Sequence, residues 1–329
     1  MGSLIELSNV SLIYQTGWLR RKAGAQAVAG VSLSVGEGEI SALVGESGCG
    51  KTSVGKLALG LIRPTSGRVL YMGKDIWGRD GKHLRPTGQI VHQDSYAALN
   101  PVRTVYQTLA APLRRYGVAR NKVREEARKL LEFVGIMPPD YFLDKYPHHM
   151  SGGMRQRLLF ARAIIPKPKF IVADEPVAMI DASLRISVLD LMLKLKEELG
   201  IAFLYISHDL ATTRYFAKNG KLAVMYLGKV AEEGPMEELL RQPLHPYLQA
   251  LLSAAPVPDP RIARERKLMP LKETEPPSAA SPPPGCRFHP RCPYAKEPCT
   301  QEVPPLVERG SGHRVACHLV DSIPPWRLI

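Results

Sequence analysis

The sequence predicts an α/β domain with a parallel core, followed by an irregular extension. Short apolar strands alternate with amphipathic helices over the first 255 residues, the pattern of a parallel sheet covered by helices. A glycine-rich loop, GESGCGKT at residues 45–52, lies between one of these strands and the next helix. Beyond residue 255, 16 of the 29 prolines fall between residues 256 and 325, a density that excludes long helices and central strands.

The first 255 residues are expected to contain six strands and four helices. Two partly alternating strands are expected first, and then four short buried strands rich in branched or aromatic residues: residues 5–14, 27–35, 40–44, 89–92, 170–173 and 202–206. Apolar residues recur at helical spacing in four segments: residues 52–61, 122–134, 155–165 and 183–199. Gly200 ends the last helix. The span from about 96 to 165 is mainly helical and is expected to form a separate lobe.

Composition restricts the class of protein. The 329 residues are 45% apolar and 23% charged, which is ordinary for a globular chain, and no apolar run reaches the length of about 18 residues that a membrane span needs. The first eleven residues lack a signal-peptide pattern, so we expect a cytoplasmic location. The net charge of +13 suits nucleotide, nucleic acid or a membrane surface, but the basic residues are scattered and do not choose among them.

The loop at residues 45–52 has the G-x-x-x-x-G-K-[ST] spacing of a phosphate-binding loop. Its glycines let backbone N–H groups turn toward phosphate oxygens, and the following helix adds the partial positive charge of its N-terminus. Lys51 adds a full charge, and Thr52 offers a hydroxyl to Mg²⁺. The residues expected to hold a nucleotide here are Gly45, Ser47, Gly48, Cys49, Gly50, Lys51, Thr52 and Ser53.

An apolar strand ends in two acids at residues 170–175 (FIVADE). The carboxyl end of such a strand lies at the ligand crevice of an α/β sheet. Asp174 is therefore expected to hold Mg²⁺, usually through water, and Glu175 to polarise the attacking water. A buried strand that ends in a solvated acidic turn gives the same pattern, but the phosphate-binding loop earlier in the chain favours the functional interpretation.

About twenty residues before this strand, the segment MSGGMRQR at residues 150–157 resembles the signature of the ATP-binding cassette (ABC) family, usually written LSGGQ. Ser151 can donate a hydroxyl hydrogen bond, and Gly152 and Gly153 leave N–H groups open at a helix N-terminus, which suits a second phosphate site. In the family this loop closes over the γ-phosphate held by the other subunit. The resemblance implies two cassettes that sandwich two ATP molecules, with Mg²⁺.

Four further residues match positions of the family. Gln93 matches the Q-loop, which senses Mg²⁺ and the attacking water, and Asp181 matches the D-loop at the dimer interface. His208 matches the switch histidine, whose imidazole hydrogen-bonds the γ-phosphate. Tyr14 matches the aromatic residue that stacks on adenine. The resemblance therefore assigns the catalytic positions to Gln93, His208 and Glu175.

The signature departs from the family at Met150 and Met154, where Leu and Gln are usual. Methionine for leucine conserves volume, but methionine for glutamine removes an amide and puts the composite site formed by this signature in doubt. Glu175 and His208 are intact, so we expect the chain's own site to hydrolyse ATP. The family fold is an ABC-type P-loop NTPase core with a helical subdomain and an N-terminal antiparallel β subdomain, which would occupy residues 1–255.

Residues 245–260 (HPYLQALLSAAPVPDP) resemble the stretch that follows the cassette in oligopeptide and dipeptide importers, and residues 256–329 would be that subfamily's extension. Four thiolates in an irregular segment suit a [4Fe–4S] cluster or Zn²⁺, and the spacing, unlike a paired C-x-x-C ribbon, favours iron–sulfur. Zinc with histidine substitutes (His289, His313 or His318) and unligated thiols stay as alternatives. The four thiols are those of Cys286, Cys292, Cys299 and Cys317.

The resemblance implies the ATPase subunit of a di- or oligopeptide importer, peripheral to the cytoplasmic face of the membrane. Its partners would be two permease subunits docked through the helical lobe and the Gln93 loop, a sister cassette chain and, indirectly, a substrate-binding protein, with no nucleic acid. The same subfamily includes oligosaccharide and nickel transporters. A soluble cassette that acts on DNA or the ribosome would suit the charge, but the sequence has no long coiled coil or second cassette. A nucleotide-binding scaffold without turnover is a third class.

Overall fold

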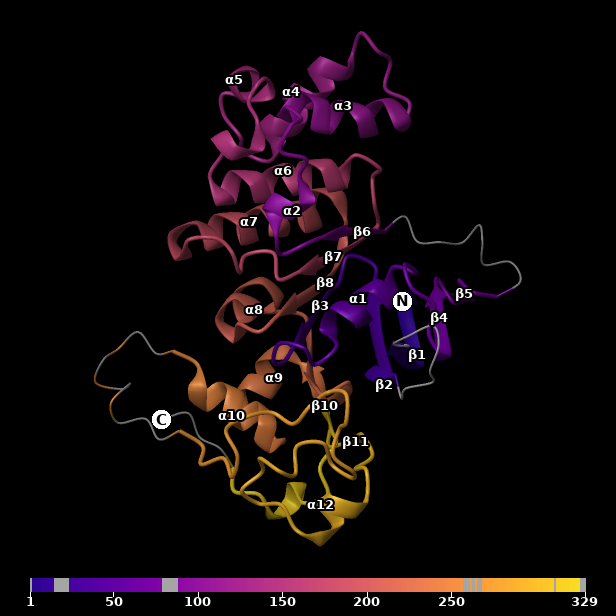
Figure 1. Cartoon of the computed structure of the whole chain (residues 1–329), viewed down its shortest axis with the longest axis vertical. Coiled ribbons are helices and arrows are strands. Elements are labelled where there is room, and N and C mark those ends of the chain that lie inside the picture. The colour runs from indigo at the N-terminus through magenta and orange to yellow at the C-terminus, as the bar shows by residue number, and fades with distance from the viewer. Residues whose placement is uncertain are drawn as a thin grey trace. The chain divides into compact units, whose positions relative to one another are not determined.

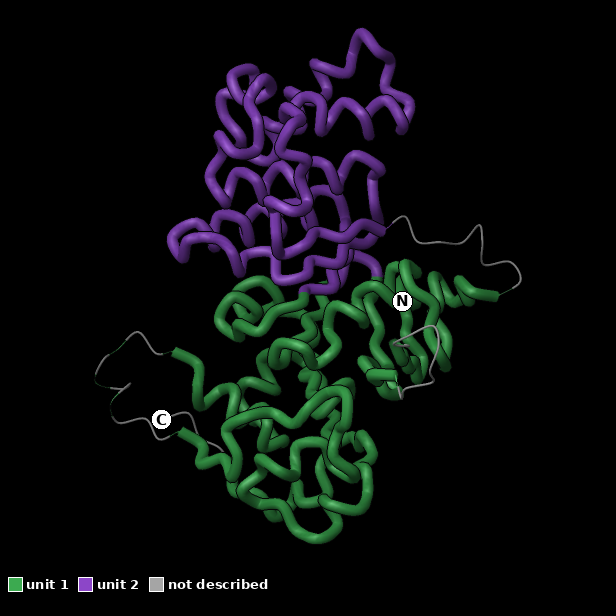
Figure 2. The backbone as a smooth tube through the Cα atoms, in the orientation of Figure 1, with its two compact units in different colours: residues 1–36, 40–84, 206–329 green, residues 37–39, 85–205 purple. Residues whose placement is uncertain are grey.

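The computed structural model describes residues 2–14, 24–78, 88–256, 259, 261, 264, 268–310 and 312–325. The chain forms two compact units, which Figure 2 shows in different colours. Unit 1 comprises residues 1–36, 40–84 and 206–329, and unit 2 comprises residues 37–39 and 85–205. The residues beyond 255 therefore group with the N-terminal strands, while the predicted domain boundary at residue 255 stays a prediction.

Unit 1 contains an antiparallel sheet with the strand order β2-β1-β4-β5 (Figure 1). The long strand β1 pairs with β2 on one side and with β4 on the other, and buries Ile5, Leu7 and Val10. This sheet confirms the predicted N-terminal antiparallel β subdomain. Its strands are β1 (Ser3–Tyr14), β2 (Ala25–Gly36), β4 (Ser66–Tyr71) and β5 (Lys74–Asp75).

A second set of strands in unit 1 has the order β11-β12-β10-β9-β3, in which β3 and β9 run parallel and the other neighbours antiparallel. The strands are β3 (Ile40–Val44), β9 (Lys221–Tyr226), β10 (Lys229–Pro235), β11 (Val307–Glu308) and β12 (Arg314–Val315). The helices of unit 1 are α1 (Lys51–Ala58), α8 (Leu210–Ala217), α9 (Met236–Arg241), α10 (Pro246–Ala254), α12 (Glu297–Gln301) and the 3-10 turn η3 (Val320–Ser322).

Unit 2 holds three strands in the order β8-β7-β6 and the helices that follow them. The strands are β6 (Gly88–Val91), β7 (Phe170–Asp174) and β8 (Ala202–Ser207), whose last two residues belong to unit 1. The helices are α2 (Ser95–Ala98), α3 (Val105–Arg115), α4 (Val123–Phe133), α5 (Pro139–Leu143), η2 (Pro147–His149), α6 (Gly152–Ile164) and α7 (Ala182–Leu199). The predicted α/β class with a mainly helical span near residues 96–165 is confirmed.

Local chemistry explains where several helices begin and end. Thr104 and Gln107 form a reciprocal capping box at the start of α3, which satisfies two backbone N–H groups. Gly200 ends α7 in the left-handed conformation, with φ of 65°, as predicted. All five residues of β3 and of β7 are buried, which matches the mainly apolar sequence of both strands. Among the described helices, none has the length and apolar character to cross a bilayer.

Candidate functional site

The phosphate-binding loop of unit 1 joins β3 to α1, and its three glycines all have positive φ, which glycine adopts most easily. Gly45 has φ of 155° and Gly50 has φ of 105°. A Cβ atom on Gly45 would collide with the carbonyl oxygen of Met225, and one on Gly50 with that of Ala27. Gly50 is also the N-cap of α1. The loop is therefore packed closely against the backbone of neighbouring segments at these two glycines.

Lys51 lies at the first position of α1, and its side chain is almost fully enclosed, with 5% of its surface exposed. Its Nζ donates to the carbonyl oxygens of Gly45 (2.7 Å) and Glu46 (3.0 Å). Both partners are uncharged carbonyl oxygens close to the N-terminus of α1. A buried positive charge at this place suits an anionic ligand such as a phosphate.

Of the other loop residues, some are exposed to solvent and one is buried. Ser47, Gly48 and Thr52 are exposed, whereas Cys49 is buried, and burial raises the pKa of its thiol. The Cys49 carbonyl accepts from the N–H of Gly228, which ties the loop to the turn after β9. The Cys49 side chain is thus a neutral packing group rather than a reactive thiol.

Tyr14, the predicted adenine-stacking residue, lies at the end of β1 and is 42% exposed. Its hydroxyl is 3.1 Å from the hydroxyl of Ser53 in α1. The aromatic ring is thereby tied to the helix that follows the phosphate-binding loop. Tyr14, Ser53 and the loop all belong to unit 1.

His208 follows β8 and is exposed, and it also belongs to unit 1. The loop around it is fixed by its neighbours. The Asp209 carboxylate accepts from the N–H groups of Ala211 and Thr212 and caps α8, while the Ser207 hydroxyl accepts from the Asp209 N–H. The two residues that flank His208 in the chain, Ser207 and Asp209, are therefore both held by hydrogen bonds.

The acidic strand end lies in unit 2. Asp174 is the last residue of β7 and is buried, and Glu175 follows it in the left-handed conformation, with φ of 49°. The Glu175 carbonyl accepts from the N–H of Ala178, which closes a tight turn after the strand. This places the two predicted acids at the carboxyl end of a buried strand, as their sequence indicated.

The predicted signature caps a helix of unit 2. The Ser151 hydroxyl accepts from the N–H of Met154 (3.3 Å), so α6 begins at Gly152. Arg155 is buried and donates to the carbonyl of Met150 (2.6 Å), and its guanidinium lies 3.6 Å from the centre of the Tyr96 ring. Met150 is itself buried, as an apolar residue in a leucine position would be.

Gln93 and Asp181, the remaining predicted site residues, are both exposed residues of unit 2. Gln93 lies two residues beyond β6, just before the Asp94 cap of α2, and Gln156 of α6 donates to the adjacent carbonyl of His92 (3.4 Å). Asp181 is the N-cap residue of α7. The predicted residues thus divide into two sets: Tyr14, the loop and His208 in unit 1, and Gln93, Ser151, Gly152, Gly153, Asp174, Glu175 and Asp181 in unit 2.

The predicted metal centre of the extension receives no support. Across the parts of the chain that the structure describes, no group of three or more His, Cys, Asp or Glu side chains is arranged to hold a metal ion. Burial raises the pKa of Cys286 to about 11 and that of Cys317 to about 12. Cys292 and Cys299 are buried.

Sequence analysis missed one contact of the phosphate-binding loop. Glu46 of the loop pairs with Arg291 of the extension and donates its N–H to the hydroxyl of Tyr247. Arg291 stands 245 positions from Glu46, and no motif contains either Arg291 or Tyr247. The only sequence feature that could have indicated this contact is Glu46 itself, an acidic residue inside a loop expected to bind anions.

Comparison with known proteins defines the class of protein. Residues 28–178 match the family model described as ABC transporter, and residues 231–299 match the oligopeptide/dipeptide transporter C-terminal region. The chain is 44% identical to a probable peptide ABC transporter ATP-binding protein, y4tS, of Sinorhizobium fredii, covering 96% of this chain and 90% of that one. It is 42% identical to the oligopeptide transport ATP-binding protein AppF of Bacillus subtilis, covering 96% and 97%.

Comparison with solved structures indicates the same class of protein. CbiO1 of Clostridium perfringens, part of the ABC transporter complex CbiONQ, aligns with a TM-score of 0.62 at 25% identity, over 73% of this chain and 91% of that one. A dimeric ATP-binding cassette, MJ0796, bound to ADP and phosphate after hydrolysis, aligns with a TM-score of 0.57 at 26% identity, over 70% and 98%. The fold and site thus define an ATPase of the ABC class. This chain belongs to the ABC transporter family and carries the C-terminal region of its oligopeptide/dipeptide branch.

Proposed function

We propose that this chain is the ATP-hydrolysing subunit that powers import of di- or oligopeptides through a membrane ABC transporter. The observation that carries the proposal is the presence, in one chain, of an intact phosphate-binding loop with a buried Lys51 and a C-terminal region of the oligopeptide/dipeptide type. The relatives named above are described as peptide or oligopeptide transport proteins. Oligosaccharide or nickel import by the same machinery is the alternative.

The phosphates and the Mg²⁺ ion have distinct ligands in this proposal. The N–H groups of the loop and Lys51 hold the β- and γ-phosphates, for which Lys51 exchanges its two backbone carbonyl partners. Thr52, Gln93 and Asp174 are the residues that would offer oxygen ligands to Mg²⁺, directly or through water. Such an ion, when bound, would supply charge neutralisation for the phosphates. Tyr14 stacks on the adenine ring.

The chemical step needs a base and a γ-phosphate contact. Glu175 accepts a proton from the attacking water, and His208 donates a hydrogen bond to the γ-phosphate. The transition state of phosphoryl transfer is loose, so positioning and charge neutralisation supply most of the rate. Rigid backbones support these roles: Glu175 lies in a closed turn, and Asp209 fixes the segment after His208.

A second cassette completes each site in this proposal. Ser151, Gly152 and Gly153 would contact the γ-phosphate bound by the partner chain, and Asp181 would lie at the interface between the two. The position of these residues at the N-terminus of α6, where Ser151 is exposed, supports this role, because N–H groups at a helix N-terminus attract anions. The partner would be a sister cassette, which makes a heterodimer.

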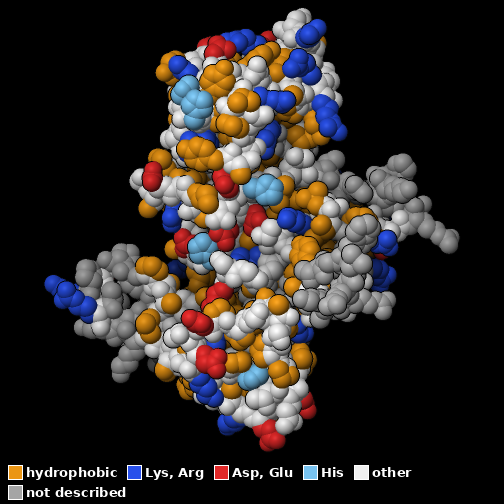
Figure 3. Space-filling view, in the orientation of Figure 1, with side chains coloured by type: hydrophobic (Ala, Val, Ile, Leu, Met, Phe, Trp, Pro, Cys, Tyr) orange, Lys and Arg blue, Asp and Glu red, His pale blue; other side chains and the backbone are white. Residues whose placement is uncertain are grey.

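The permeases would bind to the helical part of unit 2. Large apolar side chains are exposed there, and Figure 3 shows such side chains spread over this unit. In this proposal the permeases cover some of these side chains. The chain would thus sit peripherally on the cytoplasmic face, while a substrate-binding protein delivers peptide on the other side. The exposed residues are Tyr96, Val102, Tyr116, Met137, Tyr141 and Tyr146.

The catalytic role of Glu175 is tested with Glu175→Gln, which keeps the size of the side chain and removes the base. ATP binding should persist while turnover falls about 100-fold or more, the usual contribution of a general base. ATP hydrolysis and uptake of a labelled tripeptide are measured with the permeases in proteoliposomes. The control is Glu198→Gln, which changes an exposed glutamate at the end of α7 and should leave both rates unchanged.

Two results would contradict separate parts of the proposal. Full turnover in Glu175→Gln would remove Glu175 from the mechanism. Wild-type vesicles that hydrolyse ATP and take up an oligosaccharide or nickel, but no tripeptide, would leave the ATPase intact and replace the cargo.

We also propose that the four thiols of the extension bind metal, as a [4Fe–4S] cluster ahead of Zn²⁺. Support comes from the sequence: all four cysteines lie between residues 286 and 317 of the irregular, proline-rich extension. Four cysteines are the usual ligand set of such clusters. Cys49 lies in the phosphate-binding loop and takes no part.

Metal content tests this second proposal. Protein purified anaerobically should contain about four iron and four sulfide per chain, and Cys292→Ser should lose most of both. Zinc in place of iron would select the alternative ligand chemistry. Full-length protein that contains neither metal would refute the proposal.

A further inference from the structure

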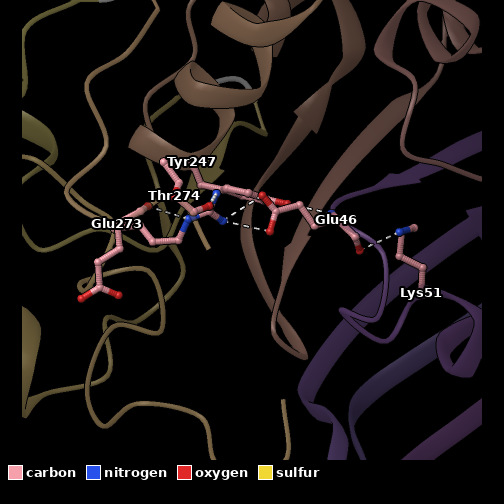
Figure 4. Close-up of polar contacts among 6 residues, drawn as sticks. Glu46, Lys51, Tyr247, Glu273 and Thr274 are labelled. Atoms are coloured by element: carbon pink, nitrogen blue, oxygen red, sulfur yellow. Dashed lines mark hydrogen bonds and ion pairs between the residues drawn. The ribbon is translucent and has the colours of Figure 1, made fainter. Parts of the chain in front are cut away.

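Glu46 places a carboxylate inside a loop that binds phosphate. All three of its polar groups are engaged, as Figure 4 shows. Its N–H donates to the Tyr247 hydroxyl (2.8 Å), and its carbonyl accepts from Lys51 Nζ (3.0 Å). Its carboxylate oxygens lie 2.8 and 2.9 Å from Nη1 of Arg291. Without such a partner, a negative charge here would repel a bound phosphate.

Arg291 is fixed by more than this ion pair. Its side chain is only 7% exposed, whereas that of Glu46 is 30% exposed. Its Nε donates to the carbonyl of Glu273 (3.3 Å) and its Nη2 to that of Thr274 (3.0 Å). All three guanidinium nitrogens therefore have partners in different directions. A lysine has a single nitrogen and cannot replace this arrangement.

An aromatic cluster supports both groups that hold Glu46. The rings of Tyr226, Tyr247 and Phe288 lie with their centres 4.6 to 5.4 Å apart. The guanidinium of Arg291 lies 5.8 Å from the Phe288 ring and 5.9 Å from the Tyr226 ring. The cluster joins β9, α10 and the extension, so the extension reaches the loop through a packed, buried platform.

We propose that Arg291 is a positioning residue for nucleotide binding: it neutralises Glu46 and so keeps the phosphate-binding loop receptive to ATP. The inference rests on the proposed nucleotide site at this loop. Removal of Arg291 leaves a partly buried carboxylate unpaired beside Lys51, where it competes with the phosphates for the lysine charge. The extension thereby sets the affinity of a site that lies some 240 residues earlier in the chain.

A purely structural role for the ion pair makes a different prediction. If Arg291 only anchored the extension, removing the Glu46 charge as well would not restore nucleotide binding. If Arg291 acts by neutralising Glu46, the double variant should regain it, because the unpaired charge is gone. Rescue by the second substitution therefore separates the two roles.

The experiment measures the dissociation constant of MgATP for the purified full-length chain by calorimetry. Arg291→Met should weaken binding at least about fivefold, the lower end of typical coupling between sites. Glu46→Gln/Arg291→Met should return to within about threefold of wild type, as expected once the unpaired charge is removed. The deficit of the single variant should also shrink as salt is raised from about 0.05 to 0.5 M.

Arg314→Met is the matched control. Arg314 also lies in the extension and also pairs with a shielded carboxylate, that of Glu233 in β10, but neither residue belongs to the loop. Its MgATP affinity should equal that of wild type. Equal loss in Arg314→Met and Arg291→Met would overturn the proposal, as would a double variant as weak as Arg291→Met.

If Arg291→Met or the double variant fails to fold, the single variant Glu46→Gln still tests the proposal. Glu46→Gln with Arg291 intact should bind MgATP at least as tightly as wild type, since it removes only negative charge from the loop. Weaker binding by this variant would overturn the proposal. A wild-type chain that binds no MgATP would refute the nucleotide site itself, which is a different result.

Discussion

The backbone of Glu175, the proposed general base, has an uncommon conformation. Five described residues other than glycine have positive φ, and Glu175 is the one that directly follows the buried strand β7. Such a backbone costs about 1–3 kcal/mol and persists only where the surroundings impose it. Glutamine fits the same conformation as glutamate. The Glu175→Gln variant therefore changes the proposed proton acceptor and not the turn, so its effect on turnover tests the proposed role of the carboxylate.

Tyr14 gives a second test at this scale, because its ring and its hydroxyl have separable roles. Tyr14→Ala should weaken ATP binding roughly tenfold, since aromatic stacking on a base contributes about 1–3 kcal/mol. Tyr14→Phe loses only the hydrogen bond to Ser53 and should bind ATP nearly as wild type does. Equilibrium titration with ATP compares the three proteins. Equal affinity in wild type and Tyr14→Ala would exclude the stacking role.

At the scale of elements, local signals predicted what local chemistry determines. Residues 40–44 form a strand as predicted, because a short, mainly apolar run before a glycine-rich loop admits few alternatives. The end of α7 at Gly200 was predicted for the same reason. The start of α6 at Gly152 precedes the predicted residue 155, because the Ser151 cap, rather than the apolar spacing, determines where the helix begins.

Elements that depend on distant partners were not predicted. Strands β9 and β10 went unassigned, and β10 pairs with β12 some 80 residues later. The prediction that the proline-rich segment holds no central strand was wrong, because the short strand β12 lies between β10 and β11. The pair formed by Arg291 and Glu46 is of the same kind. Sequence spacing describes neighbours along the chain and carries no information on contacts of this separation. The motif residues were therefore identifiable, and the group that neutralises the loop was not.

At the scale of the whole molecule, unit 1 contains a group of buried, hydrogen-bonded polar side chains near α10. The Glu232 carboxylate is fully buried and accepts from the N–H groups of Leu244 and His245 and from His313 Nε2 (2.6 Å). His245 caps α10 by accepting from the Tyr247 N–H. Burial lowers the pKa of His245 to about 4, against 6.5 in an unfolded chain. The residue that positions Tyr247, and through it Glu46, is thus neutral only while the pH stays well above 4.

The chain should therefore lose stability in mild acid. Between pH 6.5 and 4 the unfolded chain binds a proton at His245 that the folded chain excludes, so unfolding becomes easier as the pH falls. The shift corresponds to a loss of up to about 3 kcal/mol across this window, at about 1.4 kcal/mol per pH unit. His245→Asn keeps an acceptor for the cap but has no proton to bind, so its stability should fall less. Urea midpoints at pH 7.5, 6.0 and 5.0 measure the difference between the two proteins. Identical midpoint shifts would show that His245 is not the group that titrates.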